Sequence, residues 1–260
     1  MTLDPTRLAR TMPDVSAGVS LATVQPLIAR HIPLYRTKAP TYHTELLRAF
    51  QVLWDPNHAR VLDVGGGTGI IAQAMKDLFA IPHVTSVDVQ DRFLKTLDIE
   101  TRVYDGARLP FADGAFDCVT FSNVLHHVPP AVRPGLMREC ARVAGDGPIY
   151  IKDHLAASRL DHARLFALDA MGNVPFGGMV MASYLTAADW QAIADAAGAR
   201  IERQISGTYR SGAFEQLFPN RLEVTMRLQA LTSPVIPDEK APFRADEIRD
   251  PAQKASEGPD

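Results

Sequence analysis

The feature that most constrains the fold of this chain is a short apolar run that ends in an acid and a cluster of glycines. It reads V-L-D-V-G-G-G-T-G over residues 61–69, and apolar residues at helical spacing follow over residues 70–79. Glycine tolerates positive φ and lets a ligand approach the backbone closely. The order predicts a buried strand, a tight turn and a helix whose open N–H groups face a bound ligand.

The spacing of the glycines distinguishes between the known types of glycine-rich loop that bind nucleotide-like cofactors. A dinucleotide fingerprint, G-x-G-x-x-G, would have Ile70 at its last glycine when counted from Gly65. Counting from Gly67 puts Ala72 there, a tolerated residue that falls well inside the predicted helix. No Lys-Ser or Lys-Thr pair follows the glycines, which argues against a P-loop. The pattern present is an acid, Asp63, followed by G-x-G-x-G.

This pattern closely resembles the first motif of the class I methyltransferases that use S-adenosylmethionine. In that family the acid and the glycines end the first strand and surround the methionine end of the cofactor. The resemblance therefore implies S-adenosyl-L-methionine as the cofactor, bound by Asp63, Gly65, Gly66, Gly67 and Gly69.

A second acid follows at about the distance that one strand–helix–strand unit spans. The run V-T-S-V-D-V covers residues 84–89, with Asp88 about 20 residues beyond the glycine loop. Ligands of open α/β sheets lie across the carboxyl ends of the strands. We therefore expect Asp88 and the adjacent Val89 to bind the cofactor, with the carboxylate at its ribose hydroxyls. The alternative is that Asp88 caps the next helix.

Two further segments extend the resemblance. Residues 105–117 read D-G-A-R-L-P-F-A-D-G-A-F-D and are similar to a signature of the branch that includes the ubiquinone and menaquinone biosynthesis methyltransferases. This similarity implies that Asp105 and the backbone of Gly106 contact the adenine. Residues 122–128, S-N-V-L-H-H-V, match the branch's strand-end pattern, which implies that Ser122 and Asn123 lie against the methionine part. The L-P-F segment also suits a turn that packs on the core.

Strand and helix signals alternate along the rest of the chain. Short apolar runs at 60–64, 84–89, 117–122 and 148–152 are separated by helical patterns, which predicts a parallel sheet covered by helices. Residues 200–209 and 221–231 predict two more strands joined by a short loop. With the resemblance, the expected fold class is α/β: a Rossmann-like, doubly wound, seven-stranded and mostly parallel sheet with helices on both faces and the last strand antiparallel.

The expected organisation has three parts. Residues 1–55 form an N-terminal helical cap, residues 56–231 the methyltransferase domain, and residues 232–260 a disordered tail rich in proline and charge. Residues 156–183 are expected to form a lid over the acceptor. Its helix should turn Leu165, Leu168 and Met171 inward, and Phe176, Met179 and Met181 are candidates for an apolar acceptor pocket. Further on, Thr186 and Asp189 predict a capping box, and Gly198 the end of that helix.

The N-terminal helices carry side chains that would cover the cofactor from the other side. These candidates are Arg30, His31, Tyr35, Arg36, Tyr42 and His43. The arginines suit a substrate carboxylate or phosphate, or else simply face solvent.

Methyl transfer from a cationic sulfur mainly requires alignment and exclusion of water. A base is needed only where the acceptor loses a proton, as a hydroxyl does. Of the polar residues at strand ends, His154 with Asp153 as its orienting partner is the preferred catalytic pair, followed by His127; His126 is a further candidate. Structural histidines bonded to backbone are the alternative. No metal ligand set is predicted, and a small-molecule acceptor methylated at oxygen is favoured over carbon or nitrogen.

Composition limits the kinds of partner and the compartment that we expect for this protein. The net charge is −3 with mixed signs, which predicts no nucleic-acid partner. Cys118 and Cys140 lie in apolar segments, which favours a reducing compartment, and no long apolar run predicts an integral membrane segment. We therefore expect a cytoplasmic protein, while its oligomeric state is unknown from sequence. A nicotinamide-dependent oxidoreductase and a non-catalytic S-adenosylmethionine-binding accessory protein are the alternative functions.

Overall fold

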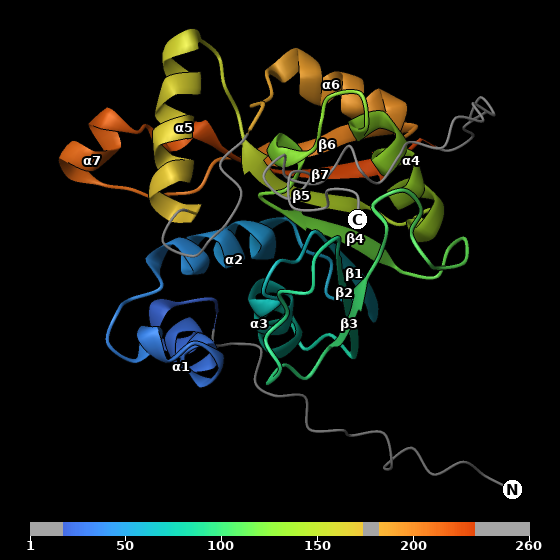
Figure 1. The fold of residues 1–260 in the computed structure, drawn as a ribbon, viewed down its shortest axis with the longest axis horizontal. Coiled ribbons are helices and arrows are strands. Elements are labelled where there is room, and N and C mark those ends of the chain that lie inside the picture. The colour runs from blue at the N-terminus through green and yellow to red at the C-terminus, as the bar shows by residue number, and fades with distance from the viewer. Residues whose placement is uncertain (1–17, 174–181, 232–260) are drawn as a thin grey trace, which may run out of the picture.

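The computed structural model describes residues 18–173 and 182–231, and it contains one seven-stranded sheet (Figure 1). The strands are β1 Arg60–Val64, β2 His83–Asp88, β3 Glu100–Val103, β4 Cys118–Ser122, β5 Ile149–His154, β6 Ala199–Ile205 and β7 Glu223–Ala230. The α-helices are α1 Leu21–His31, α2 Thr41–Leu53, α3 Ile70–Leu78, α4 Arg133–Ala144, α5 Arg159–Asn173, α6 Ala187–Ala196 and α7 Gly212–Leu217. Short 3₁₀ turns include η3, Leu125–His127.

The strand order is β3-β2-β1-β4-β5-β7-β6. Strands β1 to β5 pair in parallel, whereas β7 runs antiparallel to both β5 and β6. The chain order reverses beside β1, so the carboxyl ends of β1, β2 and β4 meet at a topological switch point, where open α/β sheets bind ligands. The expected Rossmann-like class, with an antiparallel last strand, is confirmed.

Helices cover both faces of the sheet (Figure 1). On one face α1, α2 and α3 pack over alternate strand residues such as Val61, Cys118 and Tyr150. On the other face α4 and α6 pack over the intervening residues, including Leu62 and Val119. This period of two is the consequence of strand geometry, because successive side chains point to opposite faces. Both cysteines are buried free thiols.

Local capping agrees with the sequence at α6. The Thr186 side chain accepts from the Asp189 backbone N–H, and the Asp189 carboxylate accepts from the Thr186 backbone N–H. Gly198 then follows the helix with a φ of 62°, a conformation that glycine adopts without a Cβ clash.

Two expectations about the elements are wrong, and one strand carries no signal in the sequence. The connection between β6 and β7 is not a short loop, because it contains α7. Met171 on α5 is 53% exposed rather than inward, while Leu165 is fully buried and Leu168 is partly buried. The edge strand β3 was not located in advance, since its sequence E-T-R-V is mostly exposed and has no apolar run. Phe176, Met179, Met181 and the segment 232–260 lie outside the described residues.

Candidate functional site

The glycine loop joins β1 to α3 in a conformation that depends on its glycines. Gly65 and Gly67 have φ of 73° and 58°, and the N–H groups of Gly65 and Gly66 donate to the Val87 carbonyl at 2.8 and 3.1 Å. A Cβ on Gly65 would lie 2.6 Å from Cγ2 of Val124. A Cβ on Gly67 would meet nothing within 4 Å, so this part of the loop faces open space.

That open space is a cavity of about 540 Å³ at the carboxyl ends of β1, β2 and β4. Its lining includes many of the predicted cofactor residues: Gly65, Gly66, Gly67, Asp88, Val89, Ser122 and Asn123. His127, Tyr104 and Gly172 line it as well. Ser122 Oγ is buried there without a hydrogen-bond partner among the described residues. A polar ligand fits such a wall, because a buried hydroxyl without a partner is costly.

Asp88 connects the end of β2 to the glycine loop. Its Oδ2 accepts from the Gly67 N–H at 2.8 Å, and its Oδ1 accepts from the Gln90 N–H at 3.0 Å. The described chain has no helix directly after Asp88, so the helix-cap alternative is wrong. A carboxylate has about four acceptor positions, so Asp88 retains capacity for ribose hydroxyls.

Asp63 and Gly69 do not line the cavity but support the loop. The Asp63 carboxylate accepts from Ser86 Oγ at 2.8 Å and from Thr120 Oγ1 at 3.1 Å. Burial raises the pKa of Asp63 to about 6. Gly69 precedes α3 with a φ of 76°, and a Cβ there would lie 2.5 Å from Leu97 Cδ1.

Asp105 and Gly106 also lie outside the cavity lining, which Tyr104 reaches instead. Asp105 is exposed, and its Oδ1 accepts from the N–H groups of Ala107 and Arg108 at 2.8 and 3.2 Å. The contact of Asp105 with adenine stays a prediction. The core-packing interpretation of the L-P-F turn is confirmed, since Leu109 is 1% exposed.

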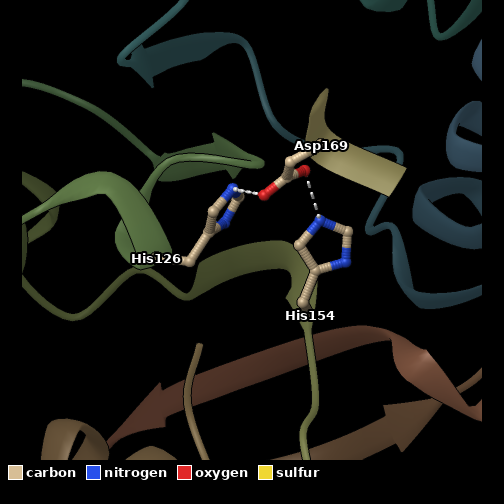
Figure 2. Close-up of side chains that lie close together, drawn as sticks. All are labelled: His126, His154 and Asp169. Carbon is tan, nitrogen blue, oxygen red and sulfur yellow. Dashed lines mark ion pairs between the residues drawn. The ribbon is translucent and has the colours of Figure 1, made fainter. Parts of the chain in front are cut away.

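Behind the cavity lies a cluster that we call the histidine–carboxylate cluster: His126, Asp153, His154 and Asp169 (Figure 2 draws three of these). Nδ1 of His126 donates to Oδ1 of Asp153 at 2.5 Å. Asp153 also accepts from the backbone N–H groups of Leu125 and His154, at 2.9 and 2.7 Å. The predicted pairing of the His154 ring with Asp153 is therefore wrong. Neighbours in a strand point to opposite faces, and Asp153 instead reaches the ring that follows β4.

The His154 ring faces two other carboxylates. Its Nε2 lies 3.4 Å from Oδ1 of Asp169, and its Nδ1 lies 3.2 Å from Oε2 of Glu223. Tyr184 donates its hydroxyl proton to Asp169 at 2.6 Å. The imidazole and hydroxyl groups hold the pKa of Asp169 at about 2, against the opposing effect of burial.

A second buried group, which we call the lysine cluster, links Lys152, Tyr42, Asn123 and Glu223. Nζ of Lys152 donates to the Tyr42 hydroxyl and to Oε2 of Glu223 at 2.5 Å, and to Oδ1 of Asn123 at 2.7 Å. Burial lowers the pKa of Lys152 to about 8. Through Asn123 the lysine cluster reaches the cavity, so Tyr42 is the N-terminal candidate that contacts the site.

The other N-terminal candidates lie elsewhere. Arg30 and Arg36 are exposed, which favours the solvent-facing alternative. His31 contacts Thr96, and Tyr35 is buried against His43.

Sequence reasoning missed Asp169, Glu223 and the role of Lys152. A signal exists for Lys152 and for Asp169. Lys152 lies in a strand whose six residues are all buried, so it requires an acidic partner. Asp169 follows the buried Leu165 by one helical turn, which puts an acid on an apolar face.

Known proteins agree with this fold and cavity. Residues 35–204 match the model of a family described as "Methyltransferase domain". The chain therefore belongs to this family, the class I S-adenosylmethionine-dependent methyltransferases. The cofactor of this family is S-adenosyl-L-methionine, and membership in it argues against the nicotinamide-dependent alternative.

Two curated relatives and one solved structure illustrate the likeness. The chain is 34% identical to the ubiquinone/menaquinone biosynthesis C-methyltransferase UbiE of Desulfotalea psychrophila, over 36% of this chain and 40% of the relative. It is 33% identical to the ubiquinone biosynthesis O-methyltransferase of Xanthomonas oryzae pv. oryzae, over 34% of this chain and 40% of the relative. The match thus spans 40% of the length of each of these relatives.

The fold is similar to a chain of a Haloferax volcanii complex that contains the Trm112 methyltransferase activator. The TM-score is 0.60 at 15% identity, with 84% of this chain and 99% of that chain covered. This likeness concerns the fold alone. Within the described residues, no helix combines the length and the apolar character needed to cross a bilayer.

Proposed function

We propose that this methyltransferase acts on a small molecule and methylates it at an oxygen atom. The observation that carries the proposal is the histidine-rich end of the cavity, where His127 lines the wall and contacts the His126 ring with centroids 4.0 Å apart. Imidazole near the reacting atoms suits an acceptor that must lose a proton. The O-methyltransferase named above, a curated relative, supports the same choice.

The residues would fall into two groups: those that line the cavity and contact the ligands, and those behind the cavity that position them. The bound cofactor supplies a methyl group on a cationic sulfur. The glycine loop, Asp88 and Ser122 hold the cofactor, and His127 accepts the proton of the acceptor hydroxyl at a ring nitrogen. Asp153 and His154 act from behind as positioning residues, since Asp153 fixes the His126 ring. Asp63 supports the loop from beneath, and Asp105 with Gly106 would complete the adenine site.

The proposed domain roles follow the same division. The described part of residues 1–55 would cap the cofactor side, and the described part of residues 156–183 would contribute to the lid that selects the acceptor. The two free thiols favour a reducing compartment such as the cytoplasm as the place of action.

The direct test supplies the full chain with cofactor labelled with ¹³C at the methyl group and a fractionated metabolite extract. Product analysis by NMR should show a new O-methyl carbon in a small molecule. Label in an N-methyl or C-methyl group would contradict the choice of oxygen. Tight binding of S-adenosylhomocysteine with no transfer to any fraction would favour the non-catalytic accessory protein.

Variants then test the residue roles. His127→Asn should lower kcat by about 10²-fold or more, the usual contribution of a general base, while S-adenosylhomocysteine binds nearly as before. His154→Ala should also lower turnover. Unchanged turnover in His127→Asn would remove it from the reaction. His83→Ala, at an exposed position before the body of β2, is the matched control.

A further inference from the structure

The histidine–carboxylate cluster contains an arrangement that methyl transfer itself does not require. His126, His154 and Asp169 come from η3, β5 and α5, and each offers one ligand atom within 4.8 Å of the others (Figure 2). All three residues are at most 9% exposed. Three metal-binding side chains thus converge inside the molecule from three different elements.

The contacts of Asp169 with the two imidazoles are longer than good hydrogen bonds, and each uses a different carboxylate oxygen. Nε2 of His126 lies 3.4 Å from Oδ2 of Asp169, and Nε2 of His154 lies 3.4 Å from Oδ1 of the same residue. Good N–H···O bonds are about 2.9–3.0 Å long. Ligand atoms about 2.1 Å from a tetrahedral metal ion are separated by about 3.4 Å.

Two ring nitrogens of the cluster have no hydrogen-bond partner among the described residues, Nε2 of His126 and Nδ1 of His154. Both nitrogens are buried. Because Nδ1 of the His126 ring donates to Asp153, a neutral His126 presents a lone pair at Nε2, directed at the Asp169 carboxylate. Two lone pairs that face each other in a buried place repel, unless a cation lies between them.

The outer partners also match a metal centre. Histidines that bind metals usually direct their other ring nitrogen to a carboxylate or carbonyl, which fixes the tautomer and the ring. Here Nδ1 of His126 is held by Asp153, whereas Nδ1 of His154 lies 3.2 Å from Glu223 Oε2 without forming a hydrogen bond. Tyr184 holds Asp169 in the same way, through its hydroxyl at 2.6 Å.

We propose that His126, His154 and Asp169 bind a divalent transition-metal ion of the zinc type, with two imidazoles and one carboxylate as ligands. Imidazole suits zinc, cobalt, nickel and iron, whereas magnesium and calcium prefer oxygen ligands. Three protein ligands leave a coordination position open. The neighbouring residues His127 and Gly172 line the cofactor cavity, so the open position would be close to the acceptor. The proposal concerns metal binding and does not depend on which atom is methylated.

The competing explanation is an ion pair network without metal. In that case the carboxylates of Asp153 and Asp169 pair directly with the two imidazoles, at 2.5 Å and 3.4 Å. The two explanations differ in what Zn²⁺ does to the protein.

The test uses the full chain, freed of metal by a chelator and titrated with Zn²⁺ and separately with Co²⁺. We expect one ion bound per chain, with Co²⁺ giving the visible absorption bands of a low-coordinate site. Asp169→Asn and His154→Ala should abolish this stoichiometric binding, and Asp153→Asn should weaken it 10–100-fold. His83→Ala should bind as the wild type does.

A second measurement needs no variant in the cluster. In ¹⁵N spectra of the wild-type imidazoles, Zn²⁺ should shift the Nε2 resonances of two histidines and leave the rest unchanged. Absence of stoichiometric binding by the wild type, or equal binding by folded Asp169→Asn, would overturn the proposal. Two doubly protonated histidines whose resonances do not respond to Zn²⁺ would establish the ion pair network instead. Because the readouts are metal content and spectra, failure to find methyl transfer would leave this result intact.

Discussion

At the scale of single residues, Asp88 performs two tasks with one carboxylate. It accepts two backbone N–H groups, from Gly67 and Gln90, and it lines the cavity while only 4% exposed. The carboxylate therefore fixes the shape of the glycine loop and remains available to a ligand. Its removal should affect cofactor affinity through both tasks.

Replacement of Asp88 by alanine should weaken binding of S-adenosylhomocysteine by roughly 1–3 kcal/mol, because buried donors lose their acceptor. Isothermal titration calorimetry measures this directly. Asp91→Ala is the control, since Asp91 is largely exposed and pairs with Lys95 in an i,i+4 contact. Affinity equal to that of the wild type would remove Asp88 from the ribose site.

Asp63 illustrates a buried acid with an altered pKa. Burial raises its pKa from 3.8 to about 6, so the folded protein binds this proton more tightly than the unfolded chain does. The stability that it contributes is therefore fully present below its unfolded pKa and is lost as the pH rises through about 6. The size of the loss is about 3 kcal/mol.

Asp63→Asn carries no such titration. From about pH 4 to about pH 7, the unfolding free energy of the wild type should fall by roughly 2–3 kcal/mol relative to this variant. Urea unfolding of both proteins across this range measures the difference. Asp91→Asn should run parallel to the wild type, and a parallel curve for Asp63→Asn would contradict the raised pKa.

At the scale of elements, two glycines of the glycine loop share a strained backbone conformation but differ in the room that a side chain would have. Both Gly65 and Gly67 have positive φ, but only a Cβ on Gly65 would collide, at 2.6 Å from Val124. Gly67→Ala should cost roughly 1–2 kcal/mol of stability, the penalty for a left-handed alanine, and it should also weaken cofactor binding because its methyl enters the cavity.

Gly65→Ala should destabilise the protein more than Gly67→Ala does, because the clash adds to the same backbone penalty. Thermal unfolding compares the two variants, and calorimetry compares their affinities for S-adenosylhomocysteine. Equal stabilities would contradict the distinction between the two positions. Full affinity in folded Gly67→Ala would show that the cofactor does not approach this part of the loop.

Elements were predictable where a local pattern exists. The runs for β1, β2, β4 and β5 are apolar because helices cover both faces of the sheet there. The capping box of α6 is predictable because it depends on only two residues, Thr186 and Asp189. The edge strand β3 gives no such signal, because it is mostly exposed. Likewise, Met171 satisfies helical spacing on α5, yet that turn is exposed, and periodicity alone does not tell where a packing surface ends.

At the scale of the whole molecule, the buried charges are brought together from distant segments. Lys152 meets Tyr42 across 110 residues and Glu223 across 71 residues. Which strand neighbours β5 is decided by topology, and β7 takes that place by inserting antiparallel between β5 and β6. The residues that line the cofactor cavity were predictable because the glycine loop, a single local motif, supplies several of them. The partners of Lys152, Asp153 and His154 were not, because they depend on this long-range arrangement.

Glu223 balances two buried cations and so stabilises the molecule as a whole. It is 1% exposed, and its two carboxylate oxygens accept from Lys152 of β5 and from Arg210 in the β6–β7 connection. Glu223→Gln would leave two cations buried without a full negative charge. We expect a loss of roughly 3–5 kcal/mol in unfolding free energy, the usual cost of breaking a buried ion pair on one side.

The matched control is Glu202→Gln, at a partly exposed acid that lies 3.3 Å from Arg227. Because water screens this pair, its loss should cost about 0–1 kcal/mol. Urea unfolding of the three proteins at neutral pH gives the comparison. If Glu223→Gln costs no more than Glu202→Gln, Glu223 does not stabilise the two buried cations as proposed. Repeating the measurement at about pH 9, where a Lys152 with a pKa of about 8 is mostly neutral, gives a second check. The penalty for Glu223→Gln should be smaller there than at pH 7, because the buried amine no longer requires a carboxylate.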